Sequence, residues 1–163
     1  MKTITDTFTV QLSNNNIDSG DRTNATYRLN IPNKRMTGYD KITMYCDAFN
    51  ADLYNLTVNT VLIQASGFYQ KNSLSVITKG SARTIGQCSR PIYRNASNVV
   101  VEKLDNVEFY GPNTPIQISS IPDETTISLV TIETGSSTID LETNDNHYHL
   151  RLRFECEYTS HNC

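Results

Sequence analysis

Five carboxylate and amide side chains fall within the seven residues of the segment 140–146. They are Asp140, Glu142, Asn144, Asp145 and Asn146. Calcium prefers carboxylate and carbonyl oxygens, so this composition suits a calcium-binding loop. The segment lacks the glycine at the sixth loop position and the closing glutamate that an EF-hand requires. We therefore interpret it as a polar hairpin turn and keep calcium binding as the alternative.

Two further groups contain residue types that bind transition metals. His147 and His149 are two positions apart, so they would share one face of a strand and could chelate zinc or copper. The sequence offers no third ligand, and we expect an exposed pair. Cys156, His161 and Cys163 form the second group, which we interpret as a strand followed by a frayed tail. We therefore predict no metal site and no cofactor.

The cysteines contain no C-x-x-C pair, which argues against a zinc ribbon. Cys46 shares a predicted strand face with apolar neighbours, and so does Cys156. We expect both to be reduced, buried thiols that pack as small hydrophobic groups. A disulfide between them is the alternative, and it needs an oxidising compartment.

Motifs for nucleophilic or phosphate chemistry are absent from the sequence. It has no G-x-S-x-G elbow and no glycine-rich phosphate loop. A carboxylate pair for sugar cleavage is defined by a distance in three dimensions, so the sequence does not identify one. We predict that the protein is not an enzyme, and we assign no catalytic residue. A hydrolase built on a β-sandwich is the alternative.

The charge balance argues against direct binding of nucleic acid. The chain has 14 Lys and Arg against 17 Asp and Glu, with a net charge of −3 and no basic run. Phosphate backbones are bound by clustered cations. We therefore expect no nucleic-acid partner.

The segment 149–158 (HLRLRFECEY) shows the clearest pattern for a regular element. Every second residue from Leu150 to Tyr158 is apolar, and the residues between them are charged or His. Side chains of a strand alternate between two faces, so this segment predicts a strand with one buried and one exposed face. A helix would place Leu150 and Leu152 about 200° apart and give no apolar stripe.

Related patterns predict most of the remaining strands. Their ranges are 5–12, 25–31, 41–49, 57–63, 73–78, 99–104, 106–109, 116–119, 126–133 and 138–141. Residues 65–68 could continue one of them past a kink at Gly67. Turn composition predicts loops at 13–23 and 33–40, and 50–56 fits either one helical turn or an irregular crossing. We interpret 79–98 as a long exposed excursion with short strand pieces near Ile92–Tyr93.

Short strands separated by turn signals about every 8–12 residues indicate an all-β sandwich or barrel with little or no helix. A fixed repeat is absent, which disfavours a propeller or a solenoid. The chain has no Trp and no Cys-Trp-Cys spacing, which disfavours an immunoglobulin fold. A single jelly-roll sandwich of two antiparallel sheets remains as the predicted fold.

The chain length of 163 residues fits one domain, 1–163, that buries roughly 70% of its unfolded surface. No apolar run reaches the roughly 18 residues of a membrane span, so we expect none. The opening MKTITDTFTV has no long apolar core, so we expect no secretory signal and a protein that stays in the compartment where it is made.

Charge is segregated along the chain. A basic stretch without acidic residues contains Lys71, Lys79, Arg83, Arg90 and Arg94. From Glu102 to Asp145 there are nine acidic residues and only one basic residue, Lys103. Two solvated faces would explain this distribution. The alternative is a head-to-tail contact in which the basic segment of one copy meets the acidic surface of the next, and such contacts form rings when the rotation closes.

The opening segments TDTFTVQLSNNN, NATYRLNIP and YDKITMYCDAF, with the closing segments TTISLVTIE, STIDLET and YHLRLRFECEY, resemble small single-jelly-roll capsid proteins. These belong to large icosahedral double-stranded DNA viruses and their polinton-like and virophage relatives. Within that group the chain is most similar to the penton, the vertex protein. The similarity covers nearly the whole chain as strand rhythm, and it assigns no site residue.

The resemblance implies a structural virion protein that closes the five-fold vertices of an icosahedral capsid as a homopentameric ring. Its implied partners are neighbouring major and minor capsid proteins, and its implied location is the virion capsid, assembled in the host cytoplasm. Two alternatives remain open: a minor capsid or spike-head jelly roll, and a lectin-like carbohydrate-binding sandwich.

Overall fold

The computed structural model describes residues 1–21, 24–31, 38–53, 60–68, 83–89, 92–97, 100–103, 106–110, 115–131, 137–138 and 146–160. Within them the chain forms two main antiparallel sheets. Sheet A has five strands: β1 (Lys2–Ser13), β4 (Lys41–Leu53), β9 (Asn106–Tyr110), β10 (Ile116–Ile118) and β13 (Asn146–Ser160). Sheet B has six strands: β2 (Ser19–Asp21), β3 (Asn24–Arg28), β5 (Thr60–Ala65), β6 (Arg83–Ser89), β11 (Glu124–Thr131) and β12 (Ser137–Thr138).

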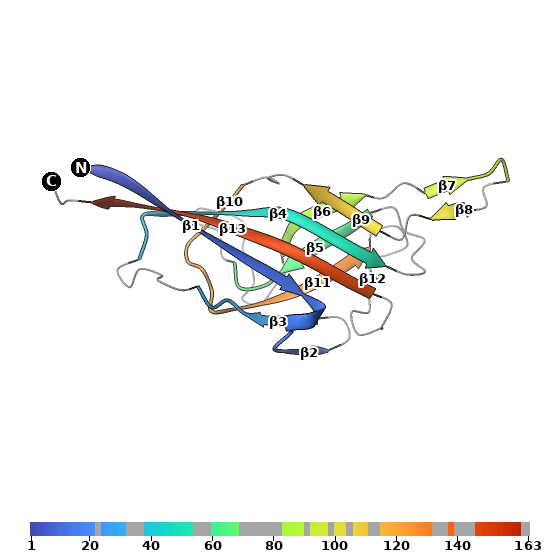
Figure 1. Ribbon diagram of the computed structural model, residues 1–163, viewed down its shortest axis with the longest axis horizontal. Coiled ribbons are helices and arrows are strands. Elements are labelled where there is room, and N and C mark those ends of the chain that lie inside the picture. Colours follow the sequence, from blue (N-terminus) through green and yellow to red (C-terminus); the bar gives the residue numbers. More distant parts are fainter. Residues whose placement is uncertain are drawn as a thin grey trace.

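The strand order alternates between early and late parts of the chain. Sheet A has the order β1-β13-β4-β10, with β9 also paired to β4. Sheet B has the order β2-β3-β11-β5-β6, with β12 beside β11. A separate hairpin joins β7 (Ile92–Arg94) to β8 (Val100–Lys103). The sheets form a sandwich, and the free ends of β1 and β13 lie side by side at one end (Figure 1). The predicted all-β, two-sheet fold class is therefore confirmed.

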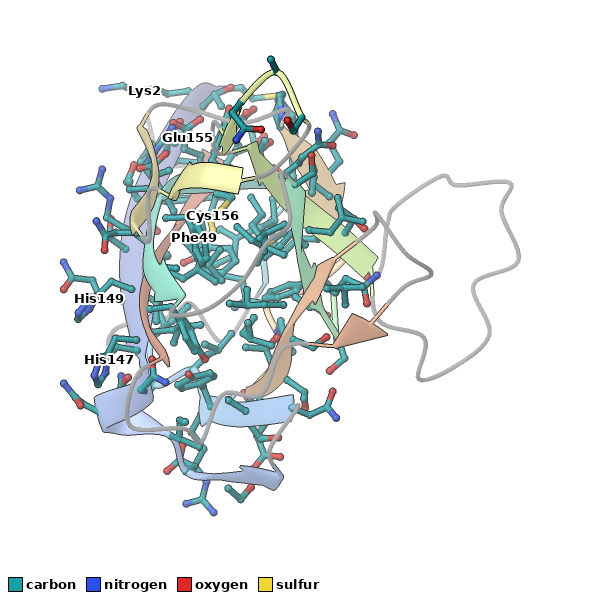
Figure 2. All side chains as sticks on the ribbon, turned by 90° about the vertical axis from the view of Figure 1, so that its right-hand side faces the viewer. Lys2, Phe49, His147, His149, Glu155 and Cys156 are labelled. Carbon is teal, nitrogen blue, oxygen red and sulfur yellow. The ribbon has the colours of Figure 1, made fainter. Side chains whose placement is uncertain are left out.

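The core lies between the sheets and is built by the alternation that the sequence shows. On β13 the side chains of Leu150, Leu152, Phe154 and Cys156 are buried, as predicted. Tyr148 extends this buried series beyond the predicted start, whereas Tyr158, predicted on the same face, is only half-buried. Sheet B contributes its own alternating residues from β3, β5 and β11. The fully buried members include Tyr27, Ile63, Ile127 and Leu129. Figure 2 shows side chains filling the space between the layers, with Phe49 and Cys156 among them.

A β-bulge in β4 changes which of its residues face the core. The register with β13 shifts between Arg151 and Leu152, because Leu152 pairs with Cys46 and Arg151 pairs with Ala48. Asp47 is the extra residue on β4. The buried apolar residues before it are the even-numbered Ile42, Met44 and Cys46, and after it the odd-numbered Phe49 and Ala51 are buried. A bulge of this kind inserts one residue and re-aims the side chains that follow.

Several predicted boundaries need correction. The predicted loop 13–23 contains a 3-10 turn, Asn14–Asn16, and strand β2. The predicted strand 41–49 continues to Leu53, so the part of 50–56 that the structure describes is neither a helical turn nor an irregular crossing. Hydrogen bonds to β13 keep these residues extended despite their weak strand pattern.

The excursion predicted for 79–98 was wrong for its central part. Residues Arg83–Ser89 form β6, which pairs with β5 along most of its length. Its alternation is broken because Ile85 and Gly86 are both buried at a second register shift. The continuation predicted for 65–68 ends at Ala65, and Gly67 turns the chain with φ of +85°. The strand predicted at 73–78 lies outside the described residues. In the described part of the chain, no helix is long and apolar enough to cross a membrane.

Candidate functional site

The outward face of sheet A is a polar surface that includes His147 and His149, which the sequence singled out. Its residues come from three neighbouring strands. They are Thr3, Thr5, Thr7, Thr9 and Gln11 of β1, His147, His149, Arg151, Arg153, Glu155 and Glu157 of β13, and Lys41, Tyr45, Asp47 and Asn50 of β4. Because the opposite face of each strand packs in the core, these residues form the surface that sheet A offers to a partner.

Arg153 organises the middle of this face. Its Nε donates to both carboxylate oxygens of Asp47, at 3.1 and 3.0 Å. Its guanidinium also pairs with Glu155 and lies over the ring of Tyr45, 4.1 Å from the ring centroid. The Tyr45 hydroxyl donates to Glu155 at 3.1 Å. These contacts raise the pKa of Arg153, chiefly through the bond to Asp47. The group is a fixed network rather than a set of mobile charges.

The charges along β13 are arranged in order of sign. His147, His149 and Arg151 lie exposed at one end of its outward face, and the acidic Glu155 and Glu157 lie toward the other end. Glu157 accepts a hydrogen bond from Lys41 Nζ at 2.7 Å, which raises the pKa of Lys41. The face therefore has a basic end and an acidic end, a pattern that would orient a charged partner.

A shallow, open depression of about 270 Å³ lies at the basic end. It is lined by Gln11, Ala48, Phe49, Asn50, His149, Leu150 and Arg151. The depression forms where the small side chain of Ala48 follows the bulge, opposite Arg151 on β13. Imidazole, guanidinium and amide groups at its rim are hydrogen-bonding groups of the kind that bind hydroxyl or carboxylate ligands.

His147 and His149 are both exposed on this face, as expected (Figure 2). The two rings lie at successive outward positions of β13. Among the described residues, no cluster of three or more His, Cys, Asp or Glu side chains is placed to hold a metal ion. His147 and His149 are therefore an exposed pair, and no described residue supplies a third metal ligand beside them.

Comparison with known proteins gives no relative. No family model, no curated protein and no solved structure matches this chain. Its function must therefore be inferred from its own residues and strand arrangement.

The structure describes only part of the other predicted groups. Cys46 and Cys156 are buried thiols on neighbouring strands rather than partners in a disulfide, as expected. Asp140–Asp145, His161 and Cys163 lie outside the described residues. Of the segregated charges, only Asp123 and Glu124 have described side chains, and both are exposed. The predicted contact between basic and acidic segments therefore stays a prediction.

Sequence reasoning missed the network around Arg153. Each of its residues was visible as a polar position on a predicted strand, but Asp47 belongs to the bulge. The bulge shifts the register between β4 and β13 by one residue. A sequence-based pairing that does not include this shift places the wrong residues of β4 and β13 opposite each other. The available signal was that predicted outward positions of both strands carry charges of opposite sign. Only the register between the strands shows that these charged side chains lie next to each other.

Proposed function

We propose that the protein is a structural virion component, a single jelly roll that closes the five-fold vertices of an icosahedral capsid as a homopentamer. Its mechanism is packing and ring closure, and no catalytic step is assigned to it. The proposed partners are its own copies in the ring and the neighbouring major and minor capsid proteins, in a capsid assembled in the host cytoplasm.

The nested order of strand pairing is the observation that carries the proposal. The first strand, β1, pairs with the last, β13. Moving inward along the chain, β3 pairs with β11, β4 pairs with β9 and β10, and β5 pairs with β6. This is the pairing of one long hairpin. Two further pairings, β13 with β4 and β11 with β5, roll that hairpin into two sheets. A jelly roll has this double-sheet arrangement.

The capsid role has a second support in the resemblance of the opening and closing segments to penton proteins. Those segments cover all or most of β1, β3, β4, β11, β12 and β13, which include both strands of the central pairing of β13 with β4 and one strand, β11, of the central pairing of β11 with β5. The polar outward face of sheet A, with its basic and acidic ends, is suited to a contact that selects orientation. In a ring, each copy uses two different surfaces, one toward each neighbour.

The mass of the particle in solution tests the proposal. Native mass spectrometry and electron microscopy of the full chain are expected to find rings of five copies. Reversal of Arg83, Arg90 and Arg94 to Glu is expected to reduce the ring to smaller species, because like charges would then face each other. Replacement of Arg83, Arg90 and Arg94 by Lys keeps all three charges, so it serves as the matched control and is expected to leave the ring intact. A purified chain without five-fold species contradicts the vertex role.

A lectin-like binding module is the second candidate, and the depression beside His149 and Arg151 favours it. Sugar hydroxyls would bind the amide and cationic groups at its rim. A glycan array tests this candidate. Specific binding that is lost in His149→Ala and Arg151→Ala, and retained in His147→Ala, would replace the structural role with a recognition role.

A further inference from the structure

Among the strands that the structure describes, β1 is an edge strand, because its only pairing is with β13. Its twelve residues pair with β13 in twelve consecutive positions without a register shift. Exposed edges are normally protected by short length, bulges, proline or several charges. β1 has no Pro, Gly or bulge, half of its residues are β-branched, and only Lys2 and Asp6 are charged. This edge is suited to accept another strand.

The hydrogen bonds at the end of β1 show which of its backbone groups point away from β13. The Asn16 side chain donates to the Gln11 carbonyl at 3.1 Å and accepts from the Ser13 amide at 2.7 Å. In an antiparallel ladder, the N–H and C=O of one residue point to the same side, and the side alternates along the strand. The odd-numbered residues of β1 therefore face the free edge.

The neighbouring strand supports the same assignment. On β13, the Glu157 carbonyl accepts from the Asp40 amide, so the odd-numbered residues of β13 face β4. Its even-numbered residues then face β1, where Cys156 pairs with Asp6 and Phe154 pairs with Phe8. The even-numbered residues of β1 are thus used in the ladder. The N–H and C=O groups of Thr3, Thr5, Thr7 and Thr9 point off the edge, and none has a hydrogen-bonding partner among the described residues.

We propose that this edge pairs with β1 of a second copy of the chain, antiparallel about a two-fold axis, and joins the A sheets of both copies into one. Because each copy presents only odd-numbered residues, threonine faces threonine on the outward side. Facing Thr pairs stabilise antiparallel sheets. The turn at Asn14–Asn16 caps the other end of the edge, so pairing is confined to the threonine segment.

Charge selects one register within that segment. When Thr3 of one copy faces Thr5 of the other, Lys2 faces Asp6 twice and Ile4 faces Ile4. A shift that places Thr5 opposite Thr7 brings the two Asp6 carboxylates together, and the intermediate shift places Asp6 opposite Ile4. Lys2 is exposed and extends from the sandwich in Figure 2, and Asp6 is half-buried, with one oxygen accepting from Tyr39 at 3.2 Å. Opposite charges are favoured at facing positions.

The contact goes beyond the proposed ring and does not depend on it. A two-fold contact turns a monomer into a dimer, and it turns a pentamer into a decamer when its axis meets the five-fold axis at a right angle. Loss of the contact halves the mass and leaves a five-fold ring unchanged. Loss of the ring leaves the doubling by β1 in place, so the two proposals fail separately.

Thr5→Pro is the first test. The Thr5 amide faces the free edge, so proline removes a hydrogen-bond donor that the single copy does not use, and edge strands tolerate proline. Thr5→Val keeps the donor and is the matched control. Sedimentation across a dilution series is expected to show doubling of the wild-type mass, retained in Thr5→Val, with a dissociation constant raised roughly tenfold or more in Thr5→Pro. Hydrogen exchange is expected to show concentration-dependent protection of the Thr3, Thr5 and Thr7 amides.

A mixing experiment tests the two-fold symmetry and the register. Lys2→Glu places a carboxylate opposite Asp6, and Asp6→Lys places an ammonium group opposite Lys2, so each variant alone is expected to lose the doubling. An equal mixture restores it, because the introduced glutamate then faces the introduced lysine, and Asp6 of one variant faces Lys2 of the other. Thermal melting checks that both variants fold. Wild-type chains that never double, doubling that survives Thr5→Pro, a mixture that does not reassociate, or open-ended fibres in place of doubling would each overturn the proposal.

Discussion

The hydroxyl groups of Tyr27 and Tyr148 are hydrogen-bonded to each other in the interior, and this bond joins the two sheets. Tyr27 belongs to β3 of sheet B and Tyr148 to β13 of sheet A, and each is 1% exposed. Tyr27 also donates to the Ser13 carbonyl at 3.2 Å. A phenol has one proton, so Tyr148 must be the donor in the bond between the two rings. The order of donation is therefore Tyr148 to Tyr27 to Ser13.

This order predicts unequal effects for the two Phe variants. Tyr27→Phe removes the acceptor of Tyr148 and the donor to Ser13, so it leaves two polar groups without partners and is expected to lower the free energy of unfolding by about 2–4 kcal/mol. Tyr148→Phe leaves the bond from Tyr27 to Ser13 intact and is expected to cost about 1–2 kcal/mol. Urea denaturation measures both. Equal losses, or a larger loss in Tyr148→Phe, contradict the assigned direction.

The same pair predicts a loss of stability in alkali. Burial raises the pKa of Tyr27 to about 12 and raises that of Tyr148 further above its ordinary value. Below pH 10 both groups are protonated in the folded and unfolded chain, and they contribute no pH dependence. Above that, the unfolded chain loses protons that the folded chain keeps. The free energy of unfolding therefore falls by about 1.4 kcal/mol per pH unit for each group between about pH 10 and 12.

Chemical denaturation at a series of pH values checks this prediction, with Tyr148→Phe as the control. That variant has one fewer buried phenol, so its stability is expected to fall less steeply with pH. Absorbance of tyrosinate should also show groups among the nine tyrosines that titrate only when the chain unfolds. Parallel slopes in wild type and variant count against a buried phenol pair.

The pair formed by Asp47 and Arg153 is predicted to stabilise the bulge. Their side chains are 15% and 23% exposed, and the Nε of Arg153 contacts both oxygens of Asp47. Asp47→Asn removes the charge at nearly constant volume and is expected to cost about 1–2 kcal/mol. Glu124→Gln breaks the exposed pair with Arg28. In that pair Arg28 Nε lies 3.5 Å from Glu124 Oε1, and the side chains of Arg28 and Glu124 are 74% and 60% exposed. Glu124→Gln is expected to lower the free energy of unfolding by less than about 0.5 kcal/mol. Equal losses of stability for Asp47→Asn and Glu124→Gln in thermal melts would contradict this difference.

Gly38 and Gly67 both have positive φ, but among the residues that the structure describes an added side chain would make close contacts only at Gly67. Alanine variants at these two positions therefore distinguish the cost of backbone strain from the cost of steric contact. At Gly38, with φ of +79°, an added Cβ would meet no atom of the described residues within 4 Å, so Gly38→Ala is expected to cost only the backbone term of about 1 kcal/mol. At Gly67, with φ of +85°, a Cβ would lie 3.0 Å from the Glu124 carbonyl and 3.3 Å from Pro122. Gly67→Ala is expected to cost more, about 2–3 kcal/mol, by urea denaturation. A larger loss of stability in Gly38→Ala than in Gly67→Ala would show that the turn at Gly67 can shift away from Pro122 and the Glu124 carbonyl.

The strands with regular alternation were predictable because burial of one face repeats every second residue. β13 is the best example, since Leu150, Leu152, Phe154 and Cys156 are buried as the pattern predicts. The elements that were missed lack this repeat. β6 has adjacent buried residues at its register shift, and the end of β4 follows the bulge.

The outward surface shows the same division. The sequence identified His147 and His149 as an exposed pair, because their position on one strand face follows from spacing alone. It did not identify the network of Asp47, Tyr45 and Glu155 around Arg153, because those contacts cross between strands more than a hundred positions apart.

The sequence by itself determined that the chain is all-β, which residues of its regular strands enter the core, and that Cys46 and Cys156 are buried, since each of these follows from local composition and the two-residue period. Only the tertiary structure decided the nested pairing of strands, the bulge at Asp47, the link between Tyr27 and Tyr148, and the exposure of one edge of β1. These four features depend on which strands are neighbours and in which register they pair. Backbone hydrogen bonds are the same for every sequence, so they do not select the neighbouring strand. The packing of side chains over the whole chain selects the pairing and its register.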